Sequence, residues 1–471
     1  MKNLQLTEIL GSFDKTELKE FEKFVQSPYF NNRSEVTRFF NSIKKFHPDF
    51  DSKEFSPENI FKKVYPGKKY NDVLIRKLNS LTTNLLMDFI AVKGFREDIL
   101  EYNSKLAYML LERKLPGVFE KRSKILDDLL KKSKRDLSYY EFKLKHTSVL
   151  NGHFLNTNEK SMAGRLQNEL NDLIEYFLVV AVVQYIRFGE WSPALNIKFD
   201  LKFYKEVTNY ISSKKENEVT LSDLYYNMLM LLKTGEESYY VKLMKGREKF
   251  ETYLSELDDY NIAIVSMQYC HKRVAKGDSE YKRHQFDITK KLIDKDLIPA
   301  GFIEPYFFTN IVRNASGISE FKWAEEFIGK FKSRLNPDHS QEITDYSCAM
   351  LELSKGNFES ALKFLSKINM ERSNMKLDIK NLIIIIYYEL NYQEELISLI
   401  DTYKHFLQRD KSVTAHSKKF NSLFLKFVSE MIKIKNSNNK SAAFILNKEI
   451  ENVSYFLLKD WLLKKSSELL K

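Results

Sequence analysis

The chain has 471 residues, of which 43% are hydrophobic, and it carries a formal net charge of +11. This length and hydrophobic content allow a large buried core, which excludes a wholly disordered protein. Glycine (14 residues) and proline (9 residues) are well below average usage, so the many turns of an all-β fold or a doubly wound α/β sheet are hard to supply. The composition therefore predicts an all-α protein, and the length suggests about two to four structural units.

Several features predict a cytoplasmic setting. Two cysteines, Cys270 and Cys348, are too few for a disulfide framework and lack metal-binding spacing. Glu8 and Asp14 interrupt the N-terminal sequence before the apolar core of a signal peptide could form. The most apolar run, residues 176–183, is far shorter than the roughly 20 residues that span a bilayer. We therefore expect no export signal and no membrane span.

The first hundred residues contain four predicted helices with recognisable ends. Asp14 followed by Glu17 is a capping-box pattern, in which each side chain accepts a hydrogen bond from a backbone amide near the helix start. The first helix should end before Pro28, because the residue preceding a proline avoids the helical conformation. The signals for the other three helices are an apolar stripe over 36–46, the start sequence Ser56-Pro57-Glu58, and a leucine-rich face over 71–89.

The rest of the chain continues as amphipathic helices, and a repeated corner appears after residue 220. Residues 101–220 show no convincing repeat. From Leu221 onward, the predicted helix ends recur at spacings of 42, 40 and 39 residues. Glycine at such a corner supplies the left-handed backbone conformation that ends a helix without steric cost. The corners are Thr234-Gly235, Lys276-Gly277, Ser316-Gly317, Lys355-Gly356 and a fifth, without glycine, at Leu390-Asn391-Tyr392.

The residues after two of these corners also match. "EFKWAEEFI" (320–328) aligns with "NFESALKFL" (357–365), which pairs Phe321 with Phe358 and Ala324 with Ala361. A small residue three positions after an aromatic residue allows two helices to approach closely, while the ring fills the groove beside it. The pattern therefore predicts packed helix hairpins.

"YSCAMLELSKGNFESALKFLSKI" (346–368) resembles a tetratricopeptide repeat, with Ala349 and Ala361 in the small positions and Gly356 at the corner. "NLIIIIYYELNYQEELISLIDTY" (381–403) is similar and places Tyr392 where Phe358 stands, but it has no corner glycine. The resemblance is best over 341–409. It implies stacked antiparallel helix pairs that form a curved solenoid with a concave protein-binding groove.

The N-terminal region carries two further resemblances. The segments "FVQSPYFNN" and "VYPGKKYNDVLIRKLNSL" resemble an uncharacterised family of bacterial helical proteins. The stretch "ENIFKKVYPGKKYNDVLIRKLNSLTTNLL" is similar to the helix-turn-helix half of winged-helix activator proteins, but the strands that a wing needs are absent from the first hundred residues.

The sequence lacks the local patterns of common enzymes. It has no phosphate-binding glycine loop, and its eight histidines form no zinc-binding spacing. Cys270 and His271 are adjacent, so on a helix they point about 100° apart, which favours a buried cysteine beside an exposed histidine. Asp258 and Asp259 are interpreted as helix-terminal or solvated acids. We therefore expect a non-enzymatic protein without catalytic residues, metal site or cofactor.

The positive charge is uneven. Residues 404–471 contain 14 Lys or Arg against 6 Asp or Glu, and residues 113–145 contain 11 against 5. Lysine-rich faces keep helical proteins soluble, contact phosphates or bind acidic proteins, and the sequence leaves these three uses open. The residues that would contact phosphates are Arg76, Lys77, Lys418, Lys419, Lys464 and Lys465.

These observations predict four regions: an N-terminal helical domain (1–100), an irregular helical middle region (101–220), tetratricopeptide-like repeats (221–409) and a basic helical C-terminal cap (410–471). The predicted repeat-packing residues are Phe321, Ala324, Ala349, Gly356, Phe358, Ala361 and Tyr392. We expect an adaptor or scaffold that binds a protein partner through the repeat groove. The alternative is a nucleic-acid-associated regulator that contacts phosphates through helix 71–89 or the basic C-terminal segment.

Overall fold

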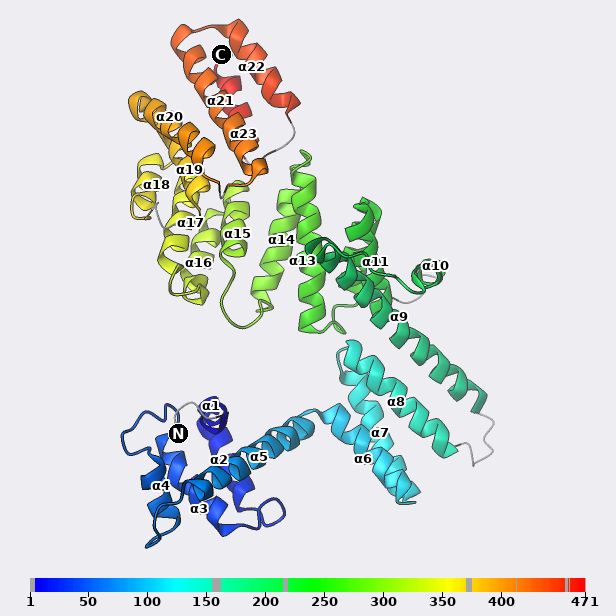
Figure 1. The fold of residues 1–471 in the computed structure, drawn as a ribbon. Coiled ribbons are helices and arrows are strands. Elements are labelled where there is room, and N and C mark those ends of the chain that lie inside the picture. Colours follow the sequence, from blue (N-terminus) through cyan, green and yellow to red (C-terminus); the bar gives the residue numbers. More distant parts are fainter. Residues whose placement is uncertain are drawn as a thin grey trace. The chain divides into compact units, whose positions relative to one another are not determined.

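The computed structural model describes residues 5–154, 162–214, 219–369, 375–411, 413–453, 456 and 458–470. These residues form 23 α-helices and no strand, which confirms the predicted all-α fold class. The chain divides into two compact units, and the boundary between them falls inside helix α9 (Met162–Leu195) (Figure 1). The first unit comprises residues 1–133 and 138–176, and the second comprises residues 134–137 and 177–471.

The first unit contains a short 3₁₀ turn (Lys44–Phe46) in addition to its α-helices. Its complete helices are α1 (Gln5–Gly11), α2 (Lys15–Gln26), α3 (Ser34–Ile43), α4 (Pro57–Val64), α5 (Asp72–Glu97), α6 (Ile99–Glu112) and α7 (Pro116–Lys132), followed by α8 (Leu137–Phe154), whose first residue belongs to the second unit.

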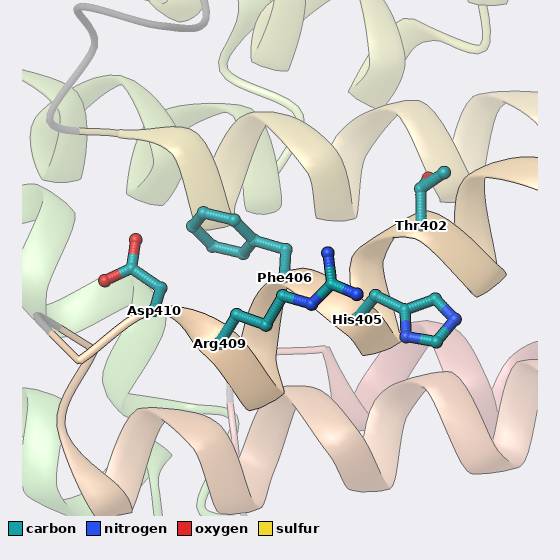
Figure 2. A pocket seen from close by; sticks show the side chains of 5 residues that line it. All are labelled: Thr402, His405, Phe406, Arg409 and Asp410. Atoms are coloured by element: carbon teal, nitrogen blue, oxygen red, sulfur yellow. The ribbon is translucent and has the colours of Figure 1, made fainter.

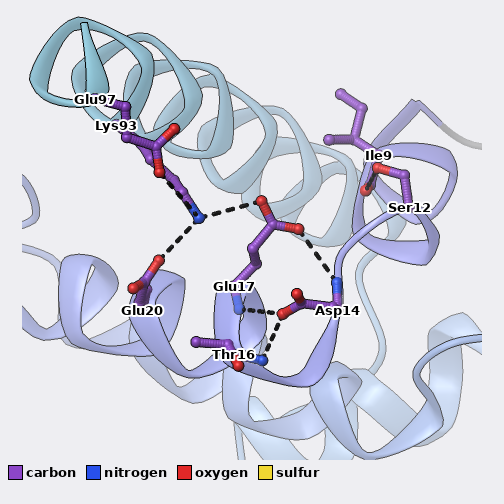
Figure 3. Close-up of polar contacts among 8 residues, drawn as sticks. All are labelled: Ile9, Ser12, Asp14, Thr16, Glu17, Glu20, Lys93 and Glu97. Atoms are coloured by element: carbon purple, nitrogen blue, oxygen red, sulfur yellow. Dashed lines mark hydrogen bonds and ion pairs between the residues drawn. The ribbon is translucent and has the colours of Figure 1, made fainter. Parts of the chain in front are cut away.

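The predicted capping box forms at the start of α2 (Figure 3). The backbone amides of Thr16 and Glu17 donate to Asp14 Oδ1 at 2.6 and 2.8 Å, and the Asp14 amide donates to Glu17 Oε2 at 3.2 Å. Lys93 on α5 lies 3.2 Å from Glu17 Oε1 and 3.0 Å from Glu20 Oε2. Hydrogen bonds to Glu20 and Glu17 raise the pKa of Lys93, so its ammonium joins α5 to α2.

Phenylalanine rings from four segments fill the core of helices α1 to α5. Phe21 on α2 is fully buried. Its ring centroid lies 5.0 Å from that of Phe40 on α3, 5.4 Å from that of Phe89 on α5, and 6.3 Å from that of Phe13. Because edge-to-face and tilted ring contacts stabilise beyond simple burial, Phe21 is the central packing residue of this core.

The second unit consists mainly of successive helix pairs. Its helices are α10 (Tyr204–Ser213), α11 (Leu221–Thr234), α12 (Glu237–Lys249), α13 (Glu256–Val274), α14 (Tyr281–Asp294), α15 (Pro305–Gly317), α16 (Phe321–Phe331), α17 (Ser340–Lys355), α18 (Phe358–Leu365), α19 (Lys376–Glu389), α20 (Gln393–Arg409), α21 (Ala415–Ser437), α22 (Lys440–Asn452) and α23 (Lys459–Glu468), with a 3₁₀ turn at Lys332–Arg334.

Each helix from α11 to α22 packs against the next, which gives six pairs beginning with α11 and α12 (Figure 1). The first helices of several neighbouring pairs also pack directly on one another: α11 on α13, α15 on α17, and α17 on α19. Among the described residues, the backbones of the second helices do not pack on one another in this way, although the ring of Phe286 on α14 lies 5.0 Å from that of Trp323 on α16. The first helices therefore form the inner layer of a helical-repeat arrangement.

Left-handed residues follow the first helices of all six pairs. At the third corner the helix continues to Gly317, and Ser319 takes the left-handed conformation that the sequence assigned to glycine. An Asn at the fifth corner also adopts this conformation, which Asn tolerates better than most residues. The corner residues with positive φ are Gly235 (69°), Gly277 (103°), Ser319 (63°), Gly356 (83°), Asn391 (59°) and, after α21, Asn438 (53°).

The predicted repeat-packing residues lie at equivalent places in their pairs. Phe321 and Phe358 begin α16 and α18, and both rings pack, partly buried, against one hydrophobic core. The alanines Ala324, Ala349 and Ala361 are fully buried in the same core. Gly356 ends α17. Tyr392 immediately precedes α20, and its hydroxyl donates to Glu359 on α18 at 2.6 Å.

A buried ion pair joins α12 to α13. Arg247 Nε lies 2.5 Å from Asp259 Oδ1, and both residues are about one-twentieth exposed, at 6% and 5%. Lys295 Nζ lies 3.3 Å from the other Asp259 oxygen and 2.6 Å from Glu251. Asp258 and Asp259 do occupy the first turn of α13, as predicted, but they are buried rather than solvated.

The last described helix, α23, is fastened to helices much earlier in the chain. Trp461 Nε1 donates to Glu389 Oε1 on α19 at 2.8 Å, and Lys465 Nζ lies 2.8 Å from Glu389 Oε2. Asp460 pairs with Lys282 on α14 at 2.9 Å. Helix α23 therefore bridges two helices that are about one hundred residues apart.

No helix in the described part of the chain is both long enough and apolar enough to cross a bilayer.

Candidate partner-binding surface

Helix α15 presents a polar stripe on the inner layer. Tyr306, Asn310 and Arg313 are spaced by four and three residues, so they share one helix face. Tyr306 is 63% exposed, and Arg313 is partly buried. Arg313 Nη1 donates to Asn310 Oδ1 at 2.8 Å, and Nη2 donates to the hydroxyl of Tyr346 on α17 at 3.3 Å. These two hydrogen bonds hold the guanidinium between α15 and α17.

Asp378, in the first turn of α19, is a carboxylate with no partner among the residues that the structure describes. The side chain is partly buried, and no described residue donates a hydrogen bond to it or forms an ion pair with it. Burial raises the pKa of Asp378, and the nearby positive charge of Arg313 opposes that rise. An ionisable group that is partly buried, perturbed and unpaired is a typical component of a binding site.

The charge of Arg313 acts on side chains from three other inner helices. Partial burial lowers the pKa of His271 on α13, and Arg313 lowers it further. Burial raises the pKa of Tyr346 on α17 to about 12, against the effect of Arg313. Asp378 on α19 is the third of these groups. We call Tyr306, Asn310, Arg313, Tyr346, Asp378 and His271 the inner-face cluster.

Two amide oxygens on the same helices support this description. Asn314 Oδ1 on α15 and Asn381 Oδ1 on α19 are buried and have no hydrogen-bond partner. Asn314 follows Arg313 directly, and Asn381 lies three residues after Asp378, on the same side of α19. Buried acceptors without partners are uncommon in proteins, and each needs an explanation.

Replacing Asp378 by asparagine is expected to stabilise the protein at neutral pH. Because the folded state raises the pKa of this carboxyl, it holds the proton more tightly than the unfolded chain does. The stability of the unmodified protein should therefore fall as the pH rises from the ordinary carboxyl pKa through the raised value. Asparagine cannot ionise, so the Asp378→Asn variant does not lose stability over this pH range.

Urea unfolding at acidic and at neutral pH measures the effect. The variant should be more stable than the parent at neutral pH and equal to it below the ordinary Asp pKa, where both side chains are neutral. A variant less stable than the parent at neutral pH would show that the ionised carboxylate has a stabilising partner.

Cys270 and His271, the adjacent pair in the sequence, lie on α13 and differ in exposure. Cys270 is fully buried, its thiol donates to the hydroxyl of Tyr240 at 3.6 Å, and burial raises its pKa to about 11. The thiol is therefore protonated at neutral pH, when it is a poor nucleophile. The adjacent His271 has an exposed side chain, as predicted, although the surrounding atoms remove enough water from its imidazole to lower its pKa. No group of three or more His, Cys, Asp or Glu among the described residues is arranged to hold a metal ion.

Helix α20 has hollows on two opposite faces. The first, about 570 Å³ in volume, is lined by residues spaced three or four apart, and Figure 2 shows the Arg409 guanidinium between Phe406 and His405. Lys380 Nζ on α19 lies 5.7 Å from the centroid of the Phe406 ring. The lining residues of this hollow are Thr402, His405, Phe406, Arg409 and Asp410.

The second hollow lies between α20 and α21 and has a volume of about 580 Å³. Its α20 residues, Lys404, Leu407 and Gln408, lie on the side of the helix opposite the first hollow, because each residue turns the helix by about 100°. We call it the α20–α21 groove. Its α21 residues are Lys418, Ser422, Lys426, Ser429, Glu430 and Lys433.

The predicted phosphate-contacting residues lie in three separate places. Arg76 on α5 is paired with Asp72 at 2.7 Å, and Lys77 is exposed beside it. Lys464 is exposed on α23. Lys465 is engaged by Glu389 and by Glu468, both at 2.8 Å, so its ammonium is already neutralised within the fold.

Lys418 and Lys419 are adjacent on α21, but only Lys418 lines the α20–α21 groove. Sequence analysis missed the other groove lysines: Lys404, Lys426 and Lys433. Those on α21 were detectable, because Lys418, Lys426 and Lys433 are eight and seven residues apart, which places them on one helix face.

The packing of neighbouring helix pairs supports a helical-repeat fold, and the resemblance to tetratricopeptide repeats stays a sequence-based comparison. Comparison of the chain with protein-family models, with curated proteins and with solved structures finds no match in any of the three. Function is therefore argued from the fold and the surfaces described above.

Proposed function

We propose that this protein is a non-enzymatic adaptor or scaffold that binds another protein along the inner layer of its helix pairs. In this proposal, the tetratricopeptide-like repeats at 221–409 provide the binding surface, and the basic helices at 410–471 cap it. The proposed setting is the cytoplasm, which fits two cysteines that are both free thiols. The observation that carries the proposal is the partly buried Asp378 carboxylate near the charge of Arg313, which has no hydrogen-bond or ion-pair partner among the described residues.

Partly burying a carboxylate without a hydrogen-bond donor costs free energy, because the group loses water and gains no replacement. A partner segment that places an amide N–H or a basic side chain against Asp378 would supply the missing donor. Among the described residues, Asp378 is therefore an unmet acceptor that a bound polypeptide can satisfy.

Exposed aromatic residues near the start of α15 would make a second favourable contribution to the free energy of binding. Tyr306 belongs to the inner-face cluster and is 63% exposed, and Phe302, four residues earlier, is 66% exposed. Tyrosine side chains often carry a large share of the binding energy at protein interfaces, because they offer much contact area with few rotatable bonds. A partner that covers Tyr306 would bury apolar surface beside the charged groups.

The experiment compares the intact chain with two full-length triple variants by affinity capture from native lysate and quantitative mass spectrometry. The test variant carries Tyr306→Ala, Arg313→Ala and Asp378→Asn. The control changes the same kinds of side chain at exposed positions off the inner layer: Tyr210→Ala on α10, with Lys322→Ala and Glu326→Gln on α16.

A partner bound by the inner-face cluster should be retained by the parent and by the control variant, and lost with the test variant. Capture of each candidate partner is then repeated with purified proteins, and circular dichroism checks that both variants remain folded. If every retained protein binds the folded test variant as well as the parent, the inner-face cluster is not the binding surface.

The nucleic-acid alternative has less support from the contacts. Lys465 is paired with two carboxylates, and Arg76 has an acidic neighbour in Asp72, so neither is a free cationic site. Lys77, Lys418, Lys419 and Lys464, which have no ion pair among the described residues, lie in three separate places and form no continuous phosphate-binding surface. Titration with duplex DNA and RNA at low and then moderate salt tests it directly, because phosphate binding weakens steeply as salt is added. Absence of binding at low salt would remove this alternative.

A further inference from the structure

We propose that the α20–α21 groove binds an extended acidic segment of a partner protein. The groove is about 580 Å³ in volume and lies between two adjacent helices. The axes of packed helices are about 8–10 Å apart, so a groove between them accepts a single extended chain. Four of its nine lining residues are lysines, against one glutamate.

Three of the four lysines have no partner within the fold. Among the described residues, the side chains of Lys404, Lys418 and Lys433 form no hydrogen bond and no ion pair. Lys426 is the exception, because its ammonium lies 3.3 Å from Glu449 and 3.7 Å from Glu430. Unpaired ammonium groups on both walls of one groove create a positive potential that favours an anionic occupant.

The lysine spacing fits a peptide. Lys418, Lys426 and Lys433 are separated by eight and seven residues on α21, or about 12 and 10 Å at 1.5 Å per residue. An extended peptide rises about 3.3 Å per residue and its side chains alternate between two faces, so carboxylates four positions apart share one face, lie about 13 Å apart and would face successive lysines. Leu407 is buried at the base of the groove, and the exposed Ser422 provides a hydroxyl group that can bond to a peptide backbone, whereas the Ser429 hydroxyl already donates to the Leu425 carbonyl at 2.7 Å.

The groove is less suited to a nucleic acid. Glu430 lies in its wall, and Glu449 sits against Lys426, so a continuous row of phosphates would meet negative charge at the middle of the groove. The cations of the groove are all lysines, which act as point charges, whereas arginine is the residue whose planar fork matches phosphate geometry. A peptide can place an uncharged residue opposite Glu430.

This inference is independent of the inner-face cluster, because no residue is shared between the two surfaces. Its test uses the full-length protein and a fluorescein-labelled peptide of about ten residues, with Glu at every fourth position and Ser or Gly between them. Fluorescence anisotropy measures binding at low and at moderate salt. A peptide with Gln in place of every Glu is the ligand control, and a labelled single-stranded oligonucleotide is the competing probe.

Two charge-reversed variants separate groove binding from net charge. Lys418→Glu with Lys433→Glu changes two groove lysines, and Lys322→Glu with Lys363→Glu changes two exposed lysines on α16 and α18. Both double variants lower the net charge equally. The groove variant should weaken binding of the acidic peptide by about tenfold or more, and the control variant by less than about twofold. Glu430→Gln should strengthen binding, because it removes the repelling carboxylate.

Equal losses in the two double variants would mean that the peptide senses only net charge, and the proposal would be wrong. Equal binding of the Glu and Gln peptides would also overturn it. If the oligonucleotide binds more tightly than the peptide and its binding depends on Lys418 and Lys433, the occupant is a nucleic acid and not an acidic protein segment.

Discussion

Replacing Asp259 by alanine is expected to lower the free energy of unfolding of the second unit by about 3–5 kcal/mol. Asp259 is the carboxylate that neutralises Arg247, and both side chains are buried between α12 and α13. Without it, the guanidinium stays in a low-dielectric site with no counter-charge, and its Nη1 and Nη2 atoms already lack hydrogen-bond partners. Breaking a buried pair from one side is far more destabilising than the pair itself is stabilising.

Urea unfolding followed by hydrogen exchange of amides in α12 and α13 measures this effect. Glu251→Ala is the matched control, because Glu251 pairs with the same Lys295 but at the surface, where an ion pair contributes about 0–1 kcal/mol. Replacing both members, with Arg247→Met and Asp259→Leu, should cost much less than Asp259→Ala. If the Asp259→Ala variant is as stable as the parent, the Arg247 guanidinium must be accessible to water in the folded protein.

Replacing Phe21 by alanine is expected to destabilise the first unit by about 3–5 kcal/mol. The Phe21 ring is fully buried and contacts aromatic rings from α3, α5 and the segment before α2. Removing the ring leaves a cavity that the three neighbouring rings cannot fill. The loss of stability therefore has two parts: the hydrophobic burial of the ring is lost, and the cavity itself costs free energy.

Hydrogen exchange reports the change separately for each unit. In the Phe21→Ala variant, protection should fall for amides of α2, α3 and α5 and stay unchanged in α13. The control is Tyr29→Ala, which removes an aromatic side chain that is 88% exposed and should change stability by less than about 0.5 kcal/mol. Equal effects of the two substitutions would contradict the described core.

Helix ends were the most predictable features, because they depend on residues close in sequence. Asp14 and Glu17 form the expected capping box, and Ser56 caps α4 immediately before Pro57. Gly356 adopts the left-handed conformation that its place after a helix indicated. In each case the backbone amides or dihedral angles involved lie within a few residues of the signal, so tertiary packing adds little information.

One local expectation was wrong. The third corner places its left-handed residue at Ser319 instead of Gly317, two residues later than the glycine indicated.

The candidate sites could not be found from the sequence, because their residues come together only through tertiary packing. The inner-face cluster combines residues from α13, α15, α17 and α19, which are separated by 30 to 40 residues each and meet only when the pairs stack. The burial of Asp258 and Asp259 likewise depends on Tyr225 and Arg247, which come from α11 and α12. No local spacing encodes such neighbours, whereas the lysine row on α21 is a periodic signal within one helix.

The attachment of α23 has a mechanical consequence. A stack in which each helix pair contacts only its neighbours is flexible, because small rotations at successive contacts add together and change its curvature. The bonds from Trp461 and Lys465 to Glu389, and from Asp460 to Lys282, tie both ends of the α14–α19 segment to one short helix. A change in curvature there would have to break these bonds, so we expect α14 to α23 to resist bending as a stiff block, while α11 to α13 retain the elasticity of an unbraced stack.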